Sequence, residues 1–163
     1  MTGRHPFDSV IIDSLSELQV KLMDDITNRG AMEMRAWGEV LRQLTGLTRD
    51  LRDLVSHPVK PIKTVIFIAM SKEDGRGRSI PYLQGQSATI VPYIVDICAY
   101  LAMETYHHAD PTQGKYSVRR LYVSNYDEAM VGERVGGRLG DVVEQKDLNI
   151  AKMIDKIYGV DEK

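Results

Sequence analysis

The sequence contains a single cysteine, lacks a long hydrophobic run and carries nearly balanced charge. Cys98 alone can form neither an internal disulfide nor a cysteine-rich zinc site, which is typical of a reducing compartment. No stretch approaches the roughly 18 apolar residues of a membrane-spanning helix, and residues 1–6 lack the apolar run of a signal peptide. We therefore expect a cytoplasmic protein with no membrane partner.

The net charge of −2 arises from 21 basic and 23 acidic residues, so the chain has no general basic field. Any contact with nucleic acid must therefore come from a local patch. Hydrophobic residues make up 43% of the 163 positions, and a chain of this length can bury roughly two-thirds of its unfolded surface. We expect one folded domain, or one large part of one.

Two apolar segments, 7–14 and 63–70, predict strands. Each is apolar on both faces, which is typical of a central strand covered by helices on both sides of a parallel sheet. Apolar residues at helical spacing predict a helix over about 15–28, capped by Ser14, and another over 32–55. The alternation of strands and helices predicts an α/β fold with a mainly parallel sheet.

The second half of the chain has a different character. Residues 71–79 are polar and contain glycine, which predicts a surface loop, and a short helix is expected between 80 and 92. Residues 94–124 predict two further strands separated by a polar turn, an arrangement that favours an antiparallel hairpin. A final helix is expected over 146–158, with Asp147 as its cap.

The first strand ends at an acid, Asp13. In open parallel sheets, ligands bind outside the carboxyl ends of the strands. An acid at that point can hold Mg²⁺ beside the phosphates of a nucleotide, which is the Walker B arrangement. Many α/β proteins also place an aspartate after a strand as a helix cap, so this feature alone leaves both interpretations open.

The order and spacing of these segments resemble the RecA/RadA-type recombinase ATPases, especially their compact phage-encoded relatives. The resemblance runs from Phe7 to about Asp141 and rests on segments 10–14, 64–70, 81–85, 95–101 and 119–139. It implies a three-layer RecA-like P-loop NTPase core over residues 1–163 that lacks its amino-terminal strands. It also implies a role in phage-type DNA recombination or replication, in the cytoplasm of a bacterial host.

The resemblance assigns roles to individual residues. Asp13 matches the aspartate that positions Mg²⁺, with Ser14 beside the metal's water ligands. Ser71 and Lys72 match the region that senses the γ-phosphate of ATP. The loop over 71–86 matches a segment that contacts single-stranded DNA, here through Lys72 with the two arginines of the loop, Arg76 and Arg78. Both arginines equally suit a solvated loop.

Arg134 and Arg138 match a late basic segment from which an arginine reaches the nucleotide of a neighbouring subunit. Such an arginine stabilises charge on the transferred phosphoryl group and implies a ring or filament. Pairing with nearby acids such as Glu133 is the alternative interpretation. Glu17, one helical turn after Asp13, is a candidate for activating water.

The phosphate-binding string G-x-x-x-x-G-K-[ST] does not occur in the sequence. We therefore expect the chain to be inactive alone and to be completed by a second polypeptide that carries this Walker A loop. We also expect the sheet to have an exposed edge beside its first strand. An excised fragment and a degenerate structural protein are the alternatives.

Two other classes of function remain open. One is a non-catalytic RecA-like module that docks a partner on its sheet edge, and the other is an unrelated α/β enzyme in which Asp13 is catalytic. His107 and His108 lie in a polar turn and are expected to be exposed, whereas Cys98 is expected to be buried. Tyr93, Tyr100 and Tyr106 are expected to pack rather than to stack on bases.

Overall fold

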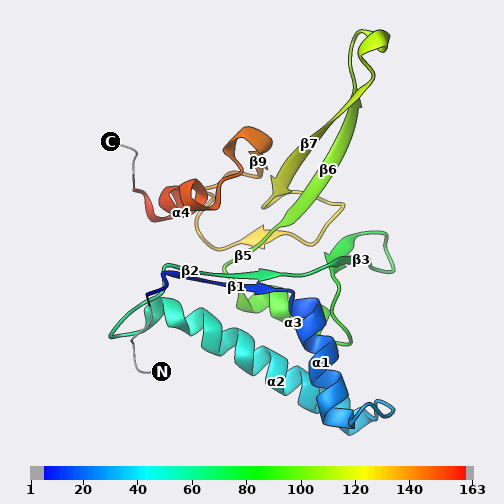
Figure 1. The fold of residues 1–163 in the computed structure, drawn as a ribbon, viewed down its shortest axis with the longest axis vertical. Coiled ribbons are helices and arrows are strands. Elements are labelled where there is room, and N and C mark those ends of the chain that lie inside the picture. The colour runs from blue at the N-terminus through cyan, green and yellow to red at the C-terminus, as the bar shows by residue number, and fades with distance from the viewer. Residues whose placement is uncertain (1–5, 161–163) are drawn as a thin grey trace. The chain divides into compact units, whose positions relative to one another are not determined.

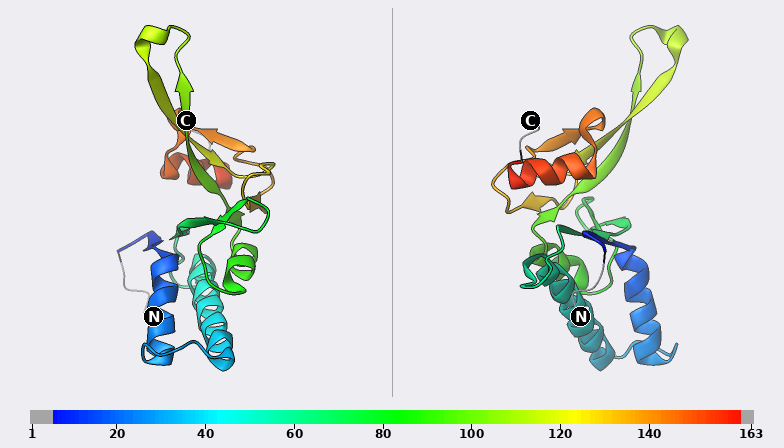
Figure 2. Two further views of the ribbon diagram at one scale, coloured as in Figure 1. Left: turned by 90° about the vertical axis from the view of Figure 1, so that its right-hand side faces the viewer. Right: turned by 60° about the vertical axis from the view of Figure 1, so that its left-hand side comes forward.

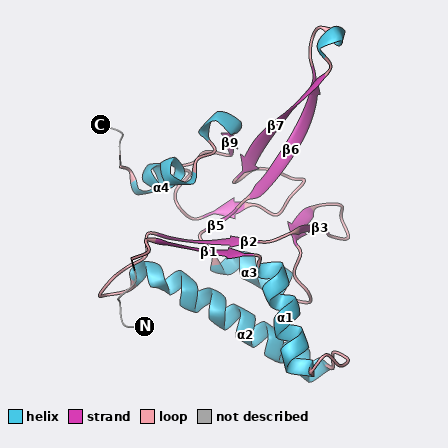
Figure 3. Cartoon of the chain, viewed as in Figure 1, coloured by secondary structure: helices cyan, strands magenta, loops and turns pink. Residues whose placement is uncertain are grey.

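The computed structural model describes residues 6–160, which form two compact units that meet in the sequence between Val95 and Asp96 (Figure 1). The first unit is built mainly from helices with short strands, and the second from antiparallel strands and one helix (Figure 3). The chain therefore has the mixed α/β composition that its sequence predicts.

The first unit begins with a strand–helix–helix–strand arrangement. Strands β1 (Ser9–Asp13) and β2 (Thr64–Ile68) pair in parallel, in a register that places Asp13 opposite Ile68. Helices α1 (Leu15–Thr27) and α2 (Met34–Asp53) connect them, and the short 3₁₀ helix η1 (Leu54–Ser56) follows α2. These bounds confirm the predicted positions of both strands and both helices.

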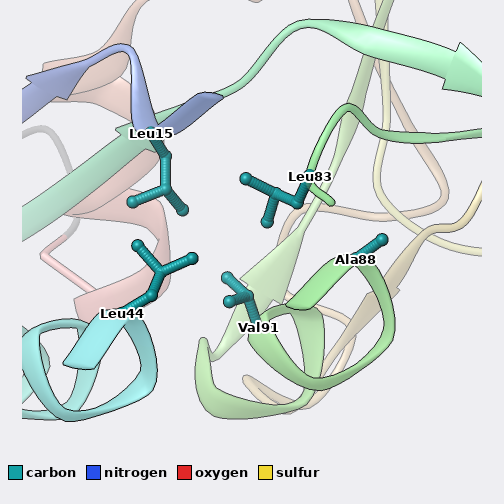
Figure 4. Packing of buried hydrophobic residues seen from close by; sticks show 5 residues of the cluster. All are labelled: Leu15, Leu44, Leu83, Ala88 and Val91. Atoms are coloured by element: carbon teal, nitrogen blue, oxygen red, sulfur yellow. The ribbon is translucent and has the colours of Figure 1, made fainter. Parts of the chain in front are cut away.

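The core of the first unit joins its helices to the segment after residue 81. Its central buried residues are Leu15, Leu44, Leu83, Ala88 and Val91 (Figure 4). They come from α1, from α2, and from helix α3 (Ser87–Ile94) with the turn before it. Burying a side chain of this type contributes about 1.5–3 kcal/mol, so this cluster holds the three helices together.

The predicted central strand is not covered on both faces. Ile11 of β1 is 55% exposed and Ile68 of β2 is 44% exposed, and these two strands form a two-stranded sheet. Helices α1, α2 and α3 lie on one side of this sheet, so the other face has no helical layer among residues 6–95 (Figure 1). An apolar run predicts burial on both faces only if both layers are present.

The expectation of a loop over 71–86 also requires correction. Strands β3 (Ser71–Glu73) and β4 (Ser79–Pro81) form an antiparallel hairpin within it. Asp74 accepts hydrogen bonds from the backbone N–H groups of Arg76 and Arg78, at 2.8 and 3.0 Å, which closes the turn. The segment is therefore an ordered projection rather than an irregular loop.

The second unit contains an antiparallel sheet in the order β6–β7–β9. Its strands are β6 (Tyr100–His107), β7 (Lys115–Tyr122) and β9 (Val142–Glu144), and the 3₁₀ turn η2 (Pro111–Gln113) lies between β6 and β7. The predicted hairpin in this region is confirmed.

Strand β5 (Ile97–Cys98) pairs with β8 (Gly132–Glu133). Four of the five strand pairings within residues 6–160 are antiparallel, so the expected mainly parallel sheet does not form there.

The last helix, α4 (Ile150–Tyr158), follows the 3₁₀ turn η3 (Gln145–Asp147). Its cap is Asn149, whose side chain accepts from the N–H of Lys152 at 3.1 Å, and not Asp147 as expected. Apolar residues of α4 pack against a buried cluster beneath the sheet, whose members are Val123, Leu139 and Val143. This cluster is the core of the second unit.

Candidate functional site

Asp13 occupies the carboxyl end of β1, and its side chain is exposed. Because β1 and β2 are parallel, both strands end at the same edge of the sheet, where Asp13 lies opposite Ile68. The hydroxyl of Ser16 in the first turn of α1 accepts a hydrogen bond from the N–H of Met70 at 3.1 Å. The start of α1 is thereby attached to the chain just past the end of β2.

Ser14 and Glu17 lie at the start of α1. The hydroxyl of Ser14 accepts from the N–H of Glu17 at 3.2 Å, so Ser14 acts as the helix cap, and the Asp13–Ser14 peptide bond is cis. Glu17 is exposed and lies 3.7 Å from Lys21. The open N–H groups and dipole at a helix start favour negative charge, which suits an anionic ligand beside Asp13.

Mg²⁺ is held in nucleotide sites by one or two carboxylates, several waters and the phosphates themselves. Asp13 offers an exposed carboxylate of this kind. Within the described part of the chain, no group of three or more His, Cys, Asp or Glu side chains could hold a metal ion. The residues present therefore fit a metal shared with a nucleotide and do not form an all-protein metal cage.

Ser71 and Lys72 begin the β3–β4 hairpin immediately beyond this edge. Ser71 is exposed. The ammonium of Lys72 donates to the carbonyl oxygen of Leu83 at 2.6 Å and lies 5.4 Å from the centre of the Tyr82 ring. Lys72 thus stabilises the base of the hairpin, and a phosphate would have to compete with that carbonyl for it.

The two arginines of the hairpin have different surroundings. The guanidinium of Arg78 donates twice to Asp74, both at 3.0 Å. The backbone N–H of Arg78 is the main cause that holds the pKa of Asp74 below its usual value. Arg76 is exposed at the turn, and within residues 6–160 its guanidinium makes no hydrogen bond or ion pair. Arg76 is therefore the arginine of this turn that is available to a ligand.

Arg134 and Arg138 lie in the second unit, and both are exposed. Arg138 donates to the carbonyl of Ile157 at 2.6 Å and so caps the end of α4. The carboxylate of Glu133 accepts from the N–H groups of Val135 and Gly137 at 2.6 and 2.8 Å. The structure thus gives the Arg138 side chain a contact at the end of α4, and the backbone N–H of Arg134 donates to the carbonyl of Asp96 at 2.9 Å.

A polar cluster on the β6–β7–β9 sheet was not anticipated from the sequence. Arg120 lies 2.5 Å from Glu104 and 3.1 Å from Glu144, and Tyr106 and Tyr122 both donate to Glu104. These hydrogen bonds lower the pKa of Glu104 and raise the pKa of each tyrosine. The sequence offered one signal for this cluster. Side chains alternate between the two faces of a strand, and along 100–107 and 115–122 this alternation places the members of the cluster on one face.

Two expectations about aromatic residues can be compared with the structure. Tyr100 stacks on Tyr126 and Tyr106 stacks on Tyr116, so the packing role is confirmed for these two. Tyr93 is 72% exposed. Cys98 is half-buried, and burial raises the pKa of its thiol.

The geometry defines an α/β protein with an acid at the end of a parallel strand. Residues 1–135 match the AAA domain family, so the chain belongs to this family of P-loop ATPases. No curated protein and no solved structure matches the chain. Across residues 6–160 no helix is both long and apolar enough to cross a membrane. Membership of this family implies nucleotide binding, typically with Mg²⁺.

Proposed function

We propose that this chain provides the magnesium-binding edge of a RecA-like ATPase that acts in DNA recombination or replication. The observation that supports the proposal most directly is the exposed carboxylate of Asp13 at the end of a parallel strand, in a chain of the AAA domain family. Asp13 would hold Mg²⁺ through its carboxylate oxygens or through the metal's waters. When bound, the metal would neutralise charge on the nucleotide's phosphates.

The phosphate-binding loop comes, in this proposal, from polypeptide outside these 163 residues. The β1–β2 sheet has two strands in the described part of the chain, so its outer edges are available for further strands. The exposed side chains of Ile11 and Ile68 supply an apolar face that a further layer of that polypeptide would cover. Glu17 and Ser14 would then lie close to the completed nucleotide site.

The β3–β4 hairpin would contact single-stranded DNA through Arg76. Ser16 of α1 holds Met70 before the hairpin, and Gln19 of the same helix holds Gln84 after it. Helix α1 starts directly after Asp13, so one helix connects the proposed metal ligand with both ends of the hairpin. This connection would allow nucleotide occupancy and DNA contact to influence one another.

The test is complementation. The chain would be mixed with a polypeptide that carries a G-x-x-x-x-G-K-[ST] loop, and Mg²⁺-dependent ATP hydrolysis would be compared with that of each component alone. We expect hydrolysis by the mixture only, and a loss of tenfold or more with Asp13→Asn, which corresponds to about 1.4 kcal/mol or more. The matched control is Asp8→Asn, which removes an exposed acid just before the same strand.

The mixture would be tested with every polypeptide encoded nearby that carries such a loop. If its rate of ATP hydrolysis never exceeded the summed rates of the two components, the split-enzyme proposal would be contradicted. The second candidate function is a non-catalytic assembly module, which the exposed apolar face of the β1–β2 sheet favours. In that case the two polypeptides would associate, but neither Mg·ATP binding nor hydrolysis would appear.

A further inference from the structure

Strand β6 forms one edge of the sheet in the second unit, since the strand order is β6–β7–β9. It is eight residues long, and its only charged side chain is Glu104, which faces the tyrosine cluster. Long edge strands usually carry lysine, proline or a bulge that prevents pairing with another chain. Strand β6 has none of these within its paired register with β7.

The exposed face of β6 is apolar in its first half. Leu101 is 58% exposed and Met103 is 68% exposed. The hairpin of β6 and β7 extends beyond β9 and α4 in the views of Figure 2, so its outer half lacks their cover within this unit. An apolar patch beside an open edge is a combination typical of strand addition.

Backbone hydrogen bonds show which residues of β6 face the open edge. The N–H of His108 donates to the carbonyl of Gly114, in register with the β6–β7 pairs. The N–H of Val123 donates to Asp141, in register with the β7–β9 pairs. Backbone groups alternate in direction along a strand, so the even-numbered residues of β6 bond to β7. Leu101, Met103 and Thr105 therefore direct their N–H and C=O groups outward.

We propose that β6 pairs with β6 of a second copy of this chain, antiparallel and about a two-fold axis at Met103. This register places Leu101 opposite Thr105 of the copy, so the residues with outward backbone groups bond to each other. It places Glu104 opposite Ala102, which avoids a like-charge pair. It also places Tyr100 opposite Tyr106, and cross-strand aromatic pairs of this kind are favourable.

Neighbouring registers are less suitable. A shift by one pair in one direction sets Glu104 directly opposite Glu104 of the copy, which is repulsive. A shift in the other direction shortens the overlap of the two strands. In a register shifted by a single residue, each residue whose backbone groups point outward would lie opposite a residue of the copy whose groups point toward β7. No ladder of backbone hydrogen bonds could then form. The strand is thus self-complementary in one register, and self-complementarity is what an isologous interface requires.

The test is the association state of the full chain, measured by sedimentation over a range of concentrations. We expect a dimer. Met103→Lys places a charge on the exposed face of the edge strand and should raise the dimer dissociation constant by about tenfold or more. Ser117→Lys is the matched control, because Ser117 is exposed on β7, one strand away from the open edge of β6, and it should leave the dimer intact.

A second measurement is independent of whether Met103→Lys folds. Cysteine would be placed at 103 or at 117 in a Cys98→Ser background, and a short thiol cross-linker would be added. Cross-linked dimers should form at 103 and much less at 117. A monomer at every concentration would overturn the proposal, as would a dimer that Met103→Lys does not weaken or that both lysine variants weaken equally. The proposal would also be overturned if the chain were recovered only in a complex in which another protein's strand pairs with β6.

Discussion

The side-chain amide of Gln19 bonds to both backbone groups of Gln84: its oxygen accepts from the N–H at 2.6 Å, and its nitrogen donates to the carbonyl at 3.2 Å. The nitrogen also donates to the hydroxyl of Ser87 at 3.1 Å. Gln19 is 1% exposed; its bond to Ser87 is buried, and its bonds to Gln84 are partly buried. Together with the contact between Ser16 and Met70, they attach both ends of the β3–β4 hairpin to helix α1.

Gln19→Leu should destabilise the chain by about 1–3 kcal/mol, because the buried hydroxyl of Ser87 and the partly buried backbone groups of Gln84 would lose this partner. The measurement is urea unfolding followed by circular dichroism. Gln43→Leu is the control, since Gln43 is exposed on α2 and surface substitutions usually change stability by less than about 0.5 kcal/mol. Equal stability of the two variants would show that the Gln19 bonds contribute nothing net.

Local signals in the sequence were sufficient for the main elements of the first unit. The apolar run ending at Asp13, the cap at Ser14 and the helical spacing that follows predict β1 and α1 without reference to the rest of the fold. The long-range features could not be predicted in this way. Gln19 resembles a surface residue of an amphipathic helix, and only the fold brings Gln84 to it across 65 residues.

The hairpin over 71–81 was missed for a different reason. Asp74 followed by Gly75 is a turn signal, but the charged residues around it are also typical of an irregular loop. The contacts of Asp74 with Arg78 decide between these outcomes, and they depend on side-chain geometry rather than on composition. The candidate site is therefore predictable from sequence at Asp13 and much less so at the β3–β4 hairpin.

Two glycines should respond in opposite directions to alanine. Gly159 adopts a φ of +70° at the end of α4, and a Cβ there would lie 3.2 Å from Nη1 of Arg138, so Gly159→Ala should cost about 1–2 kcal/mol. Gly38 lies within α2 with open space around it, so Gly38→Ala should stabilise the chain by about 0.5–1 kcal/mol. Thermal unfolding of both variants checks the two signs. Stabilisation by Gly159→Ala would contradict the assigned helix end.

The carboxylate of Glu104 should make stability depend on acid pH. Hydrogen bonds from Tyr106 and Tyr122, with the charge of Arg120, hold the pKa of Glu104 below its usual value of 4.5. The ionised form therefore stabilises the folded state above pH 4.5, and this contribution is lost as pH falls through the lowered folded-state pKa. Glu104→Gln should show a smaller loss of stability between neutral pH and about pH 3. Unfolding curves of equal pH dependence for both proteins would argue against the network.

Single-stranded DNA binding should depend on Arg76 more than on other exposed arginines. Arg76→Ala should weaken binding and reduce the slope of log affinity against log salt by about 0.7, the value for one phosphate contact on a single strand. Arg35→Ala removes an exposed arginine from α2 and should change neither quantity. Fluorescence anisotropy with a labelled oligonucleotide provides both. The same salt slope in both variants would place any DNA contact elsewhere.

The most direct test of the account is the Mg²⁺ dependence of ATP binding by the chain together with the polypeptide that carries its phosphate-binding loop. Titration calorimetry with and without Mg²⁺ would be performed on the wild type, Asp13→Asn and Asp8→Asn. We predict that Mg²⁺ strengthens ATP binding in the wild type and in Asp8→Asn, and that Asp13→Asn abolishes this effect. Retention of the full Mg²⁺ effect in Asp13→Asn would contradict a metal-binding role for the end of β1.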